Sequence, residues 1–225
     1  MSDDPNALAR RTVIAGGAAA ASLAAGAAAA QTALPGYRLG DPALAASPLT
    51  PADLATLKAS LLFGDADVAA LRKMRRVVEG QIEAILDVWY GFVASTPHLL
   101  AYFSDPATGQ PQSGYLGAVR KRFGQWILDT CDANYDAAWL AWQAEIGKRH
   151  HRMGKNKTDG ATAAAHIPMR HVLALAVPIS VTMKPFLAAK GDTAADIDAM
   201  QAAWTKSVLL QAILWSRPYT KEGDF

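Results

Sequence analysis

The residues with the clearest capacity for chemistry lie between Glu145 and Asn156, in the stretch EIGKRHHRMGKN. Two adjacent histidines, His150 and His151, end a segment whose apolar residues recur with helical period. One face of that helix would carry Trp139, Trp142, Ile146 and His150. His151 would lie about 100° further round, because each residue of an α-helix turns the chain by that angle. We therefore predict that His150 points toward the core and that His151 does not.

A metal site and a solvated helix end are the two interpretations of this pair. Basic side chains in a last helical turn interact favourably with its free carbonyls, so residues 148–152 can be a plain basic terminus. A zinc site would need more ligands, and neither H-E-x-x-H nor a second histidine or carboxylate at i+4 is present. Covalent haem attachment would need C-x-x-C-H, which is also absent. A single buried histidine suits a non-covalent haem, whose iron takes one axial protein ligand when a gas binds opposite.

Aromatic side chains on two other predicted helices could line a haem pocket. They are Trp89, Tyr90, Phe92 and Phe123. A porphyrin is a large, flat hydrophobic group that needs such walls, although aromatic residues at helical spacing are also ordinary core. Tyr90 flanks the apolar stripe of its helix, and a buried hydroxyl needs a hydrogen-bond partner. A ligand on the iron would supply that partner.

The elements that must position these residues are all predicted to be helices. Thr50 is suited to an N-cap, with Pro51 at the first helical position. An apolar stripe then runs from Val78 to Val93, with a possible break at Gly80. Turn-forming residues predict a loop over 104–114, and no alternating β-branched run predicts a strand.

The C-terminal third should contain two long apolar helices. The first runs from Pro168 to Lys190, is kinked at Pro178 and is ended by Gly191. The second spans Asp192–Ser216. With about seven helices of unequal length, the chain is predicted to form an all-α sandwich of the globin kind rather than a symmetric four-helix bundle.

Composition sets the outer limits on fold and function. The 225 residues are 51% hydrophobic and 19% charged, which is enough for one globular domain with a real core. A net charge of +2 is too small a bias to indicate nucleic-acid binding. The one cysteine, Cys131, allows no intramolecular disulfide and is either a buried small residue or a free thiol.

The N-terminal residues 1–30 are predicted to be an export signal rather than part of the fold. A twin arginine, Arg10 and Arg11, precedes an Ala/Gly-rich run and a cleavage motif at residues 28–30, as in signals of the twin-arginine (Tat) class. The protein is therefore expected in the periplasm. A retained membrane anchor is the lesser alternative, because few residues of the run are strongly apolar. Residues 31–50 read as an extended lead-in, rich in Pro, Gly, Ala and Ser.

Four stretches together carry a family resemblance. They are ILDVWYGFVASTPHLLAYFSDP, YLGAVRKRFGQWILDTC, NYDAAWLAWQAEIGKRHHR and WTKSVLLQAILWSRPYTKEGDF. In this order they resemble the protoglobins, single-domain relatives of the globin-coupled sensors. The resemblance covers about Pro51–Phe225 and implies a three-over-three globin fold with an additional N-terminal helix.

The resemblance also implies a cofactor and its contacts. Haem b would be bound non-covalently, with His150 as the proximal iron ligand. Trp89 and Tyr90 match the distal aromatic pair, and Phe123 matches the bulky distal residue of the next helix. Two basic residues, Arg122 and Arg149, are candidate partners of the haem propionates.

The family pattern further implies a homodimer formed through the last two long helices, Pro168–Lys190 and Asp192–Ser216. The chain departs from the pattern after the histidine pair, where Met153-Gly154-Lys155 replaces further basic residues. The export signal is the larger departure, since protoglobins are generally taken as cytoplasmic.

Reversible binding of O₂, CO or NO is the function expected from these residues. A haem enzyme, such as a nitric-oxide dioxygenase or peroxidase, is the alternative and would need a separate reductase, because no G-x-G-x-x-G motif follows a strand. A sensor would need a separate signalling partner. A haem-free helical interaction domain is disfavoured by the presence of the histidine and the aromatic residues.

Overall fold

The computed structural model describes residues 34–221 and 223–225. The predicted signal over residues 1–30 and the first residues of the lead-in lie outside the described residues. Within the described residues the regular elements are all helical, and the one strand-like feature is an isolated bridge between Ser104 and Pro111.

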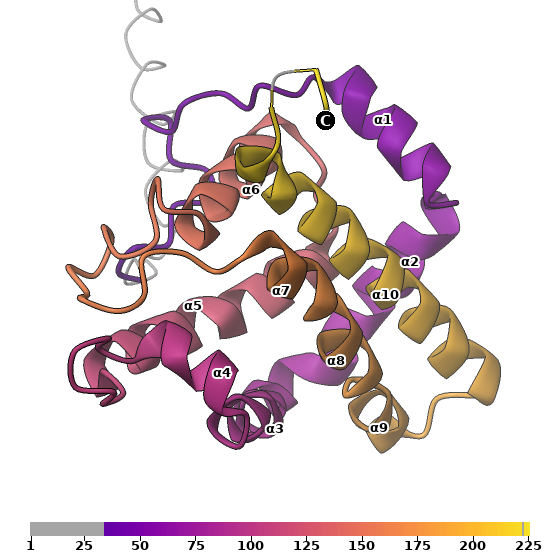
Figure 1. The fold of residues 1–225 in the computed structure, drawn as a ribbon. Coiled ribbons are helices and arrows are strands. Elements are labelled where there is room, and N and C mark those ends of the chain that lie inside the picture. Colours follow the sequence, from indigo (N-terminus) through magenta and orange to yellow (C-terminus); the bar gives the residue numbers. More distant parts are fainter. Residues whose placement is uncertain (1–33, 222) are drawn as a thin grey trace, which may run out of the picture. The chain divides into compact units, whose positions relative to one another are not determined.

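The helices follow one another along the chain with short connections (Figure 1). The α-helices are α1 (Pro51–Ser60), α2 (Asp65–Val78), α3 (Ile82–Ala94), α4 (Pro97–Leu100), α5 (Ser113–Asp132), α6 (Ala137–His150), α7 (Met169–Ala174), α8 (Ala176–Val181), α9 (Lys184–Leu187) and α10 (Ala194–Ser216). Short 3₁₀ turns occupy Glu79–Gln81, Ala101–Phe103, Ala188–Lys190 and Arg217–Tyr219.

Side-chain caps fix where several helices begin. Thr50 is the N-cap of α1 as predicted: it accepts a hydrogen bond from the backbone N–H of Asp53, whose carboxylate accepts from the N–H of Thr50, so the cap is a full capping box. Asp136 accepts from the N–H of Trp139 and thereby sets the start of α6. These caps satisfy backbone donors that would otherwise have no partner inside the helix.

The predicted break at Gly80 is present as the 3₁₀ turn between α2 and α3. Gly191 also ends its segment as predicted, with a positive φ of 76° that suits glycine. The long helix predicted over Pro168–Lys190 is confirmed in part, since the helical stretch Met169–Lys190 is interrupted near Pro178 but also a second time. The segment is divided into α7, α8 and α9, with interruptions at Leu175 and at residues 182–183.

Two prolines explain those interruptions. A proline has no N–H, so the carbonyl four residues earlier loses its helical donor. For Pro178 that carbonyl belongs to Ala174, the last residue of α7, and for Pro185 it belongs to Val181, the last residue of α8. The kink anticipated at Pro178 therefore occurs one turn earlier, and Pro185 adds a second break.

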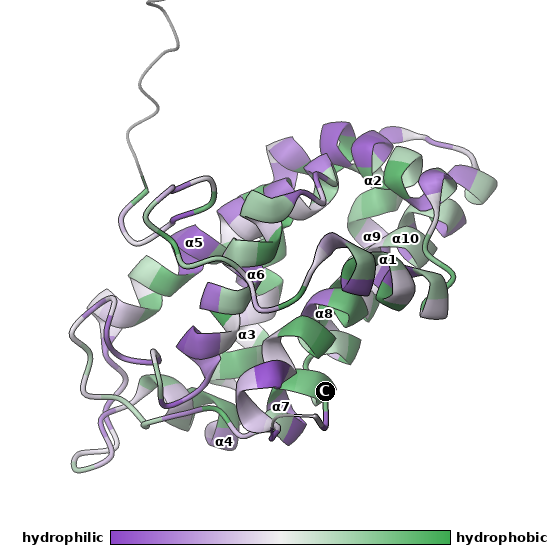
Figure 2. Ribbon diagram, turned by 90° about the horizontal axis from the view of Figure 1, so that it is seen from above, coloured by the Kyte–Doolittle hydropathy of each residue, from purple (hydrophilic) through white to green (hydrophobic). Residues whose placement is uncertain are grey.

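Helix α10 is central to the packing of the described chain. It packs against α2 and α6 and against α7, α8 and α9, while α5 packs against α2 and α3. Figure 1 shows α10 running beside α7 and α8. Hydrophilic and hydrophobic residues alternate along most helices in Figure 2, as expected for helices that bury one face.

The main core lies between α2, α5 and α10. Its fully buried members include Leu71, Met74, Ile127, Met200 and Trp204. Cys131 is buried in the same cluster, and burial raises the pKa of its thiol to about 12. Cys131 thus behaves as a small hydrophobic residue rather than as a reactive thiol.

Among the described residues, Met169–Lys190 is long and apolar enough by composition to cross a membrane, with a mean hydropathy of 1.8. Core helices of soluble proteins pass the same test. Here the segment is interrupted twice and packs against α10.

Candidate functional site

A cavity of about 220 Å³ lies among α3, α5, α6 and the segment that follows α6. Its wall is mainly apolar and aromatic, with a few polar and charged groups, which is the usual character of a cofactor site. Six of the seven residues that the sequence nominated line it, and Phe92 does not; the six are Trp89, Tyr90, Arg122, Phe123, Arg149 and His150. The fold thus brings together residues separated by up to about sixty positions along the chain.

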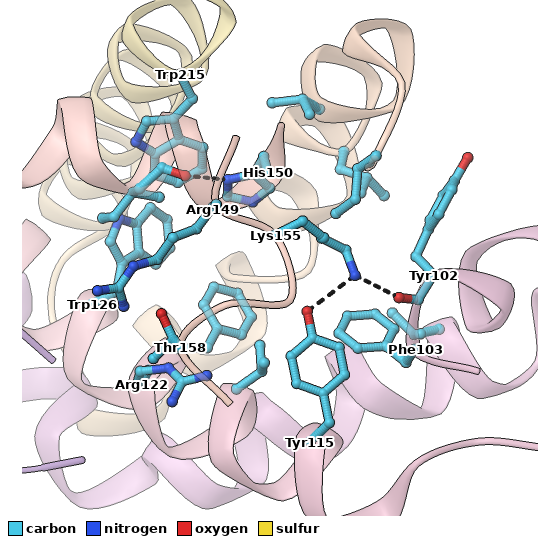
Figure 3. A pocket seen from close by; sticks show the side chains of 18 of the residues that line it. Tyr102, Phe103, Tyr115, Arg122, Trp126, Arg149, His150, Lys155, Thr158 and Trp215 are labelled. Atoms are coloured by element: carbon cyan, nitrogen blue, oxygen red, sulfur yellow. Dashed lines mark hydrogen bonds between the residues drawn. The ribbon is translucent and has the colours of Figure 1, made fainter. Parts of the chain in front are cut away.

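His150 presents one particular nitrogen to this cavity. It is the last residue of α6, and its Nδ1 lies 2.9 Å from the carbonyl oxygen of Ile146, one turn earlier (Figure 3). A carbonyl oxygen can only accept, so Nδ1 carries the proton of the neutral ring. Nε2 then keeps its lone pair, which is the form of histidine that binds a metal.

Burial and stacking hold His150 in that state. Burial lowers the pKa of His150 to about 4, so the ring is neutral near pH 7. Its ring stacks on Trp215 of α10, with centroids 5.0 Å apart and planes 15° apart. The ring therefore has little freedom to rotate, and the orientation of Nε2 is fixed.

His151 is placed differently, as the helical geometry predicts. It follows the last residue of α6, does not line the cavity, and packs edge-on against Tyr219 with centroids 4.9 Å apart. Its Nδ1 accepts a long hydrogen bond from the N–H of Met153. Its surroundings are those of a helix end, not of a cofactor wall.

Three aromatic residues form a wall on α3 and α5. Trp89 meets Phe123 edge-on at 5.6 Å between centroids, and Phe123 stacks on Trp126 at 5.3 Å. Phe92 was also expected on the buried stripe, and this was wrong, because 37% of it is exposed. Phe92 still contacts Trp89, with ring centroids 5.8 Å apart.

Tyr90 reaches the cavity with a hydroxyl that has no hydrogen-bond partner in the described part of the chain. Burial raises the pKa of this phenol above its usual range, so it keeps its proton and remains a donor. The guanidinium of Arg120 lies 5.5 Å from the centre of the Tyr90 ring. Tyr90 is therefore available to donate to a group inside the cavity.

Arg122 and Arg149 both reach the cavity, but each already has protein partners. Arg122 makes a two-pronged ion pair with Asp159, at 3.0 and 2.5 Å, and a further bond to the carbonyl of Pro35. Arg149 pairs with Glu145 at 2.9 Å and donates to the carbonyl of Gly36 at 2.6 Å. The two arginines thus tie the lead-in onto the domain beside the cavity.

The sequence-based prediction missed many residues of the wall, and three of them matter most here. Trp215 stacks on His150, and Tyr37 of the lead-in lies against Trp142 with centroids 4.9 Å apart. Lys155 lines the cavity while being only 4% exposed. Helical periodicity could have nominated Trp215, which falls on the buried face of α10, but it carries no information on Tyr37 or Lys155, which lie outside helices.

No group of three or more His, Cys, Asp or Glu side chains in the described residues could hold a metal ion. His98 of α4 packs beside His171 of α7 with ring centroids 5.4 Å apart. His171 in turn bonds the hydroxyl of Tyr102 through Nδ1 at 2.6 Å. The cavity therefore offers one neutral histidine nitrogen rather than a ligand cluster.

Comparison with known proteins identifies this architecture. The sequence profile of the Protoglobin family matches residues 50–225. The chain belongs to the protoglobin family. Among solved structures it is similar to the globin domain of the Geobacter sulfurreducens globin-coupled sensor, with a TM-score of 0.58 and 15% sequence identity. The match covers 74% of this chain and 97% of that one. No curated protein matches the sequence.

The fold expected from the sequence is thereby confirmed. The protoglobin chain has a globin fold in which α1 is the additional helix ahead of the usual ones. Membership of a globin family supports a haem-binding, gas-binding role for the cavity.

The residues on the cavity wall fit a haem. The single neutral Nε2 suits an iron that needs one protein ligand, and the aromatic wall suits the apolar faces of a porphyrin. The buried hydroxyl of Tyr90, on the same wall, has no hydrogen-bond partner in the described chain. A polar group left without a partner on a mainly apolar wall indicates that a ligand with polar atoms belongs there.

Proposed function

We propose that this protoglobin binds haem b non-covalently and uses it to bind O₂, CO or NO reversibly. The observation that carries the proposal is the hydrogen bond from His150 Nδ1 to the carbonyl of Ile146, which leaves Nε2 free on the cavity wall. His150 would hold the iron of a bound haem, and that iron would supply a site for a diatomic gas.

The residues on α3 and α5 would shape the space opposite His150. Trp89 and Phe123 restrict its size and keep water out, because their edge-on contact closes the apolar wall. Tyr90 contributes the hydroxyl that can donate to a bound gas, and such a donor stabilises partial negative charge on a ligand. No distal histidine is needed in this arrangement.

Arg122 and Arg149 are proposed to lie beside the haem carboxylates. Both guanidinium groups reach the cavity and are held in place by Asp159 and Glu145. A fixed guanidinium is a good partner for a carboxylate because its donors form a planar fork.

We also propose that the protein is exported and dimeric. The export proposal is supported by the twin arginine and the cleavage motif in residues 1–30. The dimer proposal is supported by exposed apolar side chains on α8 and α10, namely Val177 (63% exposed), Val181 (62%) and Leu209 (39%). Exposed valines one helical turn apart are typical of a contact surface.

The absorbance spectrum of the protein produced with haem available tests the proposed function. It should be recorded in the oxidised form, in the reduced form and under CO. We expect a Soret band that shifts on reduction and shifts again with CO, which indicates an iron with an open position. A well-folded helical protein that takes up no haem would contradict the proposal. Removal of both Arg10 and Arg11, followed by cell fractionation, tests export separately.

A further inference from the structure

Lys155 is a buried cation without a charged partner. It is only 4% exposed, and its ammonium makes no ion pair with a carboxylate in the described part of the chain. Its three acceptors are neutral: the backbone carbonyl of Tyr102 at 2.8 Å, the hydroxyl of Tyr115 at 3.0 Å and the amide oxygen of Asn156 at 3.4 Å. Buried charges in proteins are normally paired. The unpaired ammonium of Lys155 therefore indicates that an anionic group of a ligand binds beside it.

The ammonium lies where an anion in the cavity could meet it. Lys155 and Tyr115 both line the cavity, and Figure 3 shows the Lys155 ammonium between Tyr115 and Tyr102, well apart from Arg122 and Arg149. The Tyr115 hydroxyl oxygen accepts a hydrogen bond from Lys155, so the hydroxyl proton of Tyr115 is free to be donated to another acceptor. Burial raises the pKa of Tyr115 to about 12, so the phenol keeps that proton. The pair can therefore offer two donors to one acceptor.

One acidic residue whose charge acts on Lys155 is already paired with Arg122. Asp159 lies in the same loop, but both of its carboxylate oxygens are engaged by Arg122. Burial lowers the pKa of Lys155 to about 8, which is the effect expected of an ammonium held among neutral groups. Arg122 and Arg149 each form an ion pair with a carboxylate, whereas Lys155 forms none in the described chain.

We propose that Lys155, together with the hydroxyl of Tyr115, binds a carboxylate of the bound haem. This inference rests on the proposed haem function. It assigns a second anionic contact point, separate from the two arginines, in the loop after the iron ligand.

The rate at which haem leaves the protein tests the assignment. Haem loss to an excess of an apoglobin acceptor is measured for the wild-type protein, for Lys155→Met and for Lys157→Met. Lys157 is the matched control, since it lies in the same loop, is exposed and does not line the cavity. We expect Lys155→Met to lose haem about tenfold faster and Lys157→Met to be unchanged, since charge-assisted bonds are the strong ones.

Haem dimethyl ester separates the charge contact from a general loosening of the pocket. Both carboxylates are masked in the ester, so the difference between wild type and Lys155→Met should shrink to near zero. The unfolding of the haem-free proteins is a second readout. Lys155→Met should be at least as stable as wild type without haem, because removing a buried unpaired charge relieves a cost. Lys155→Gln repeats the comparison should Lys155→Met fail to fold.

The possible results distinguish a failure of the proposed Lys155 contact from a failure of the proposed haem function. Equal haem loss from Lys155→Met and Lys157→Met would overturn the inference while leaving the haem function intact. An equally large effect with the ester would also overturn it, because Lys155 would then act through the shape of the loop. Failure of the wild-type protein to bind haem at all would remove the proposed function and the inference together.

Discussion

At the scale of single residues, the state of His150 follows from where its helix ends. A histidine in the last turn of α6 can reach the carbonyl of Ile146, and that bond fixes both its tautomer and its direction. The stacking of the ring on Trp215 then limits its rotation. The ligand geometry is thus built by ordinary helix contacts before any cofactor binds.

Tyr90 gives the first prediction at this scale. Tyr90→Phe removes the one cavity hydroxyl on α3 without changing the size of the ring, so a bound O₂ loses a hydrogen bond. We expect O₂ to dissociate about tenfold faster, as measured by stopped-flow mixing of the oxygenated protein with dithionite.

Tyr135→Phe is the matched control for that measurement. Its hydroxyl bonds Ser207, and it does not line the cavity. An O₂ off-rate that changes no more for Tyr90→Phe than for Tyr135→Phe would exclude Tyr90 from contact with the gas.

The residues that could be predicted from the sequence lie on helices. Placing His150 on the face shared with Trp139 and Trp142 required only the helical period. Lys155 could not be placed in that way, because it follows the helix and its direction depends on how the loop folds back. A Cβ added to the preceding Gly154 would lie 2.9 Å from the carbonyl oxygen of Lys148, so the loop turns closely against the end of α6.

At the scale of elements, the contact between α6 and α10 positions His150, the proposed iron ligand. The absence of a side chain at Gly147 allows the two helices to approach closely. A Cβ at this position would lie 3.1 Å from the Cα and 3.2 Å from the carbonyl oxygen of Trp215. Both are backbone atoms, which cannot move aside as a flexible side chain can. This close approach brings Trp215 against His150, three residues further along α6.

Gly147→Ala therefore should separate the two helices. We expect a loss of about 1–3 kcal/mol in the free energy of unfolding, measured with urea. The haem should also be held more weakly, because the Trp215 support moves away from His150.

Gly117→Ala is the control for helix propensity alone. Gly117 lies inside α5, and a Cβ there would meet nothing within 4 Å. That variant should gain about 0.5–1 kcal/mol from the better helix former. If Gly147→Ala were stabilised in the same way, the close approach of α6 and α10 would not be what positions His150.

Some helix boundaries could be predicted from the sequence and others could not. The capped starts at Thr50 and Asp136 depend on neighbouring residues, and the Thr50 cap was predicted. The division of Met169–Lys190 depends on lost backbone donors at Pro178 and Pro185, and an apolar pattern alone does not reveal it.

At the scale of the whole molecule, the lead-in completes the domain. Tyr37 donates to Asp129 at 2.5 Å and packs on Trp142, while the carbonyls of Pro35 and Gly36 accept from the two arginines. The lead-in was expected to be merely extended, and its contacts with the cavity wall could not be predicted because they join residues 87 to 113 positions apart.

The proposed dimer gives the prediction at this scale. Val181→Glu places a charge on the exposed apolar face of α8, where a partner would have to bury it. We expect the dimer dissociation constant to rise at least about tenfold, measured by light scattering during size-exclusion chromatography.

Leu62→Glu is the matched control for surface charge. Leu62 is 81% exposed and lies between α1 and α2, outside the proposed contact surface. A dimer that weakens equally in both variants, or not at all, would contradict an interface on α8 and α10.

The central claim is that His150 holds the haem iron, and one measurement tests it most directly. The absorbance spectrum of the reduced protein is recorded for His150→Gly before and after imidazole is added, with His151→Gly as the control. We predict that His150→Gly loses the wild-type haem spectrum and regains it with imidazole, while His151→Gly keeps it throughout. A wild-type spectrum for His150→Gly without imidazole would contradict the account.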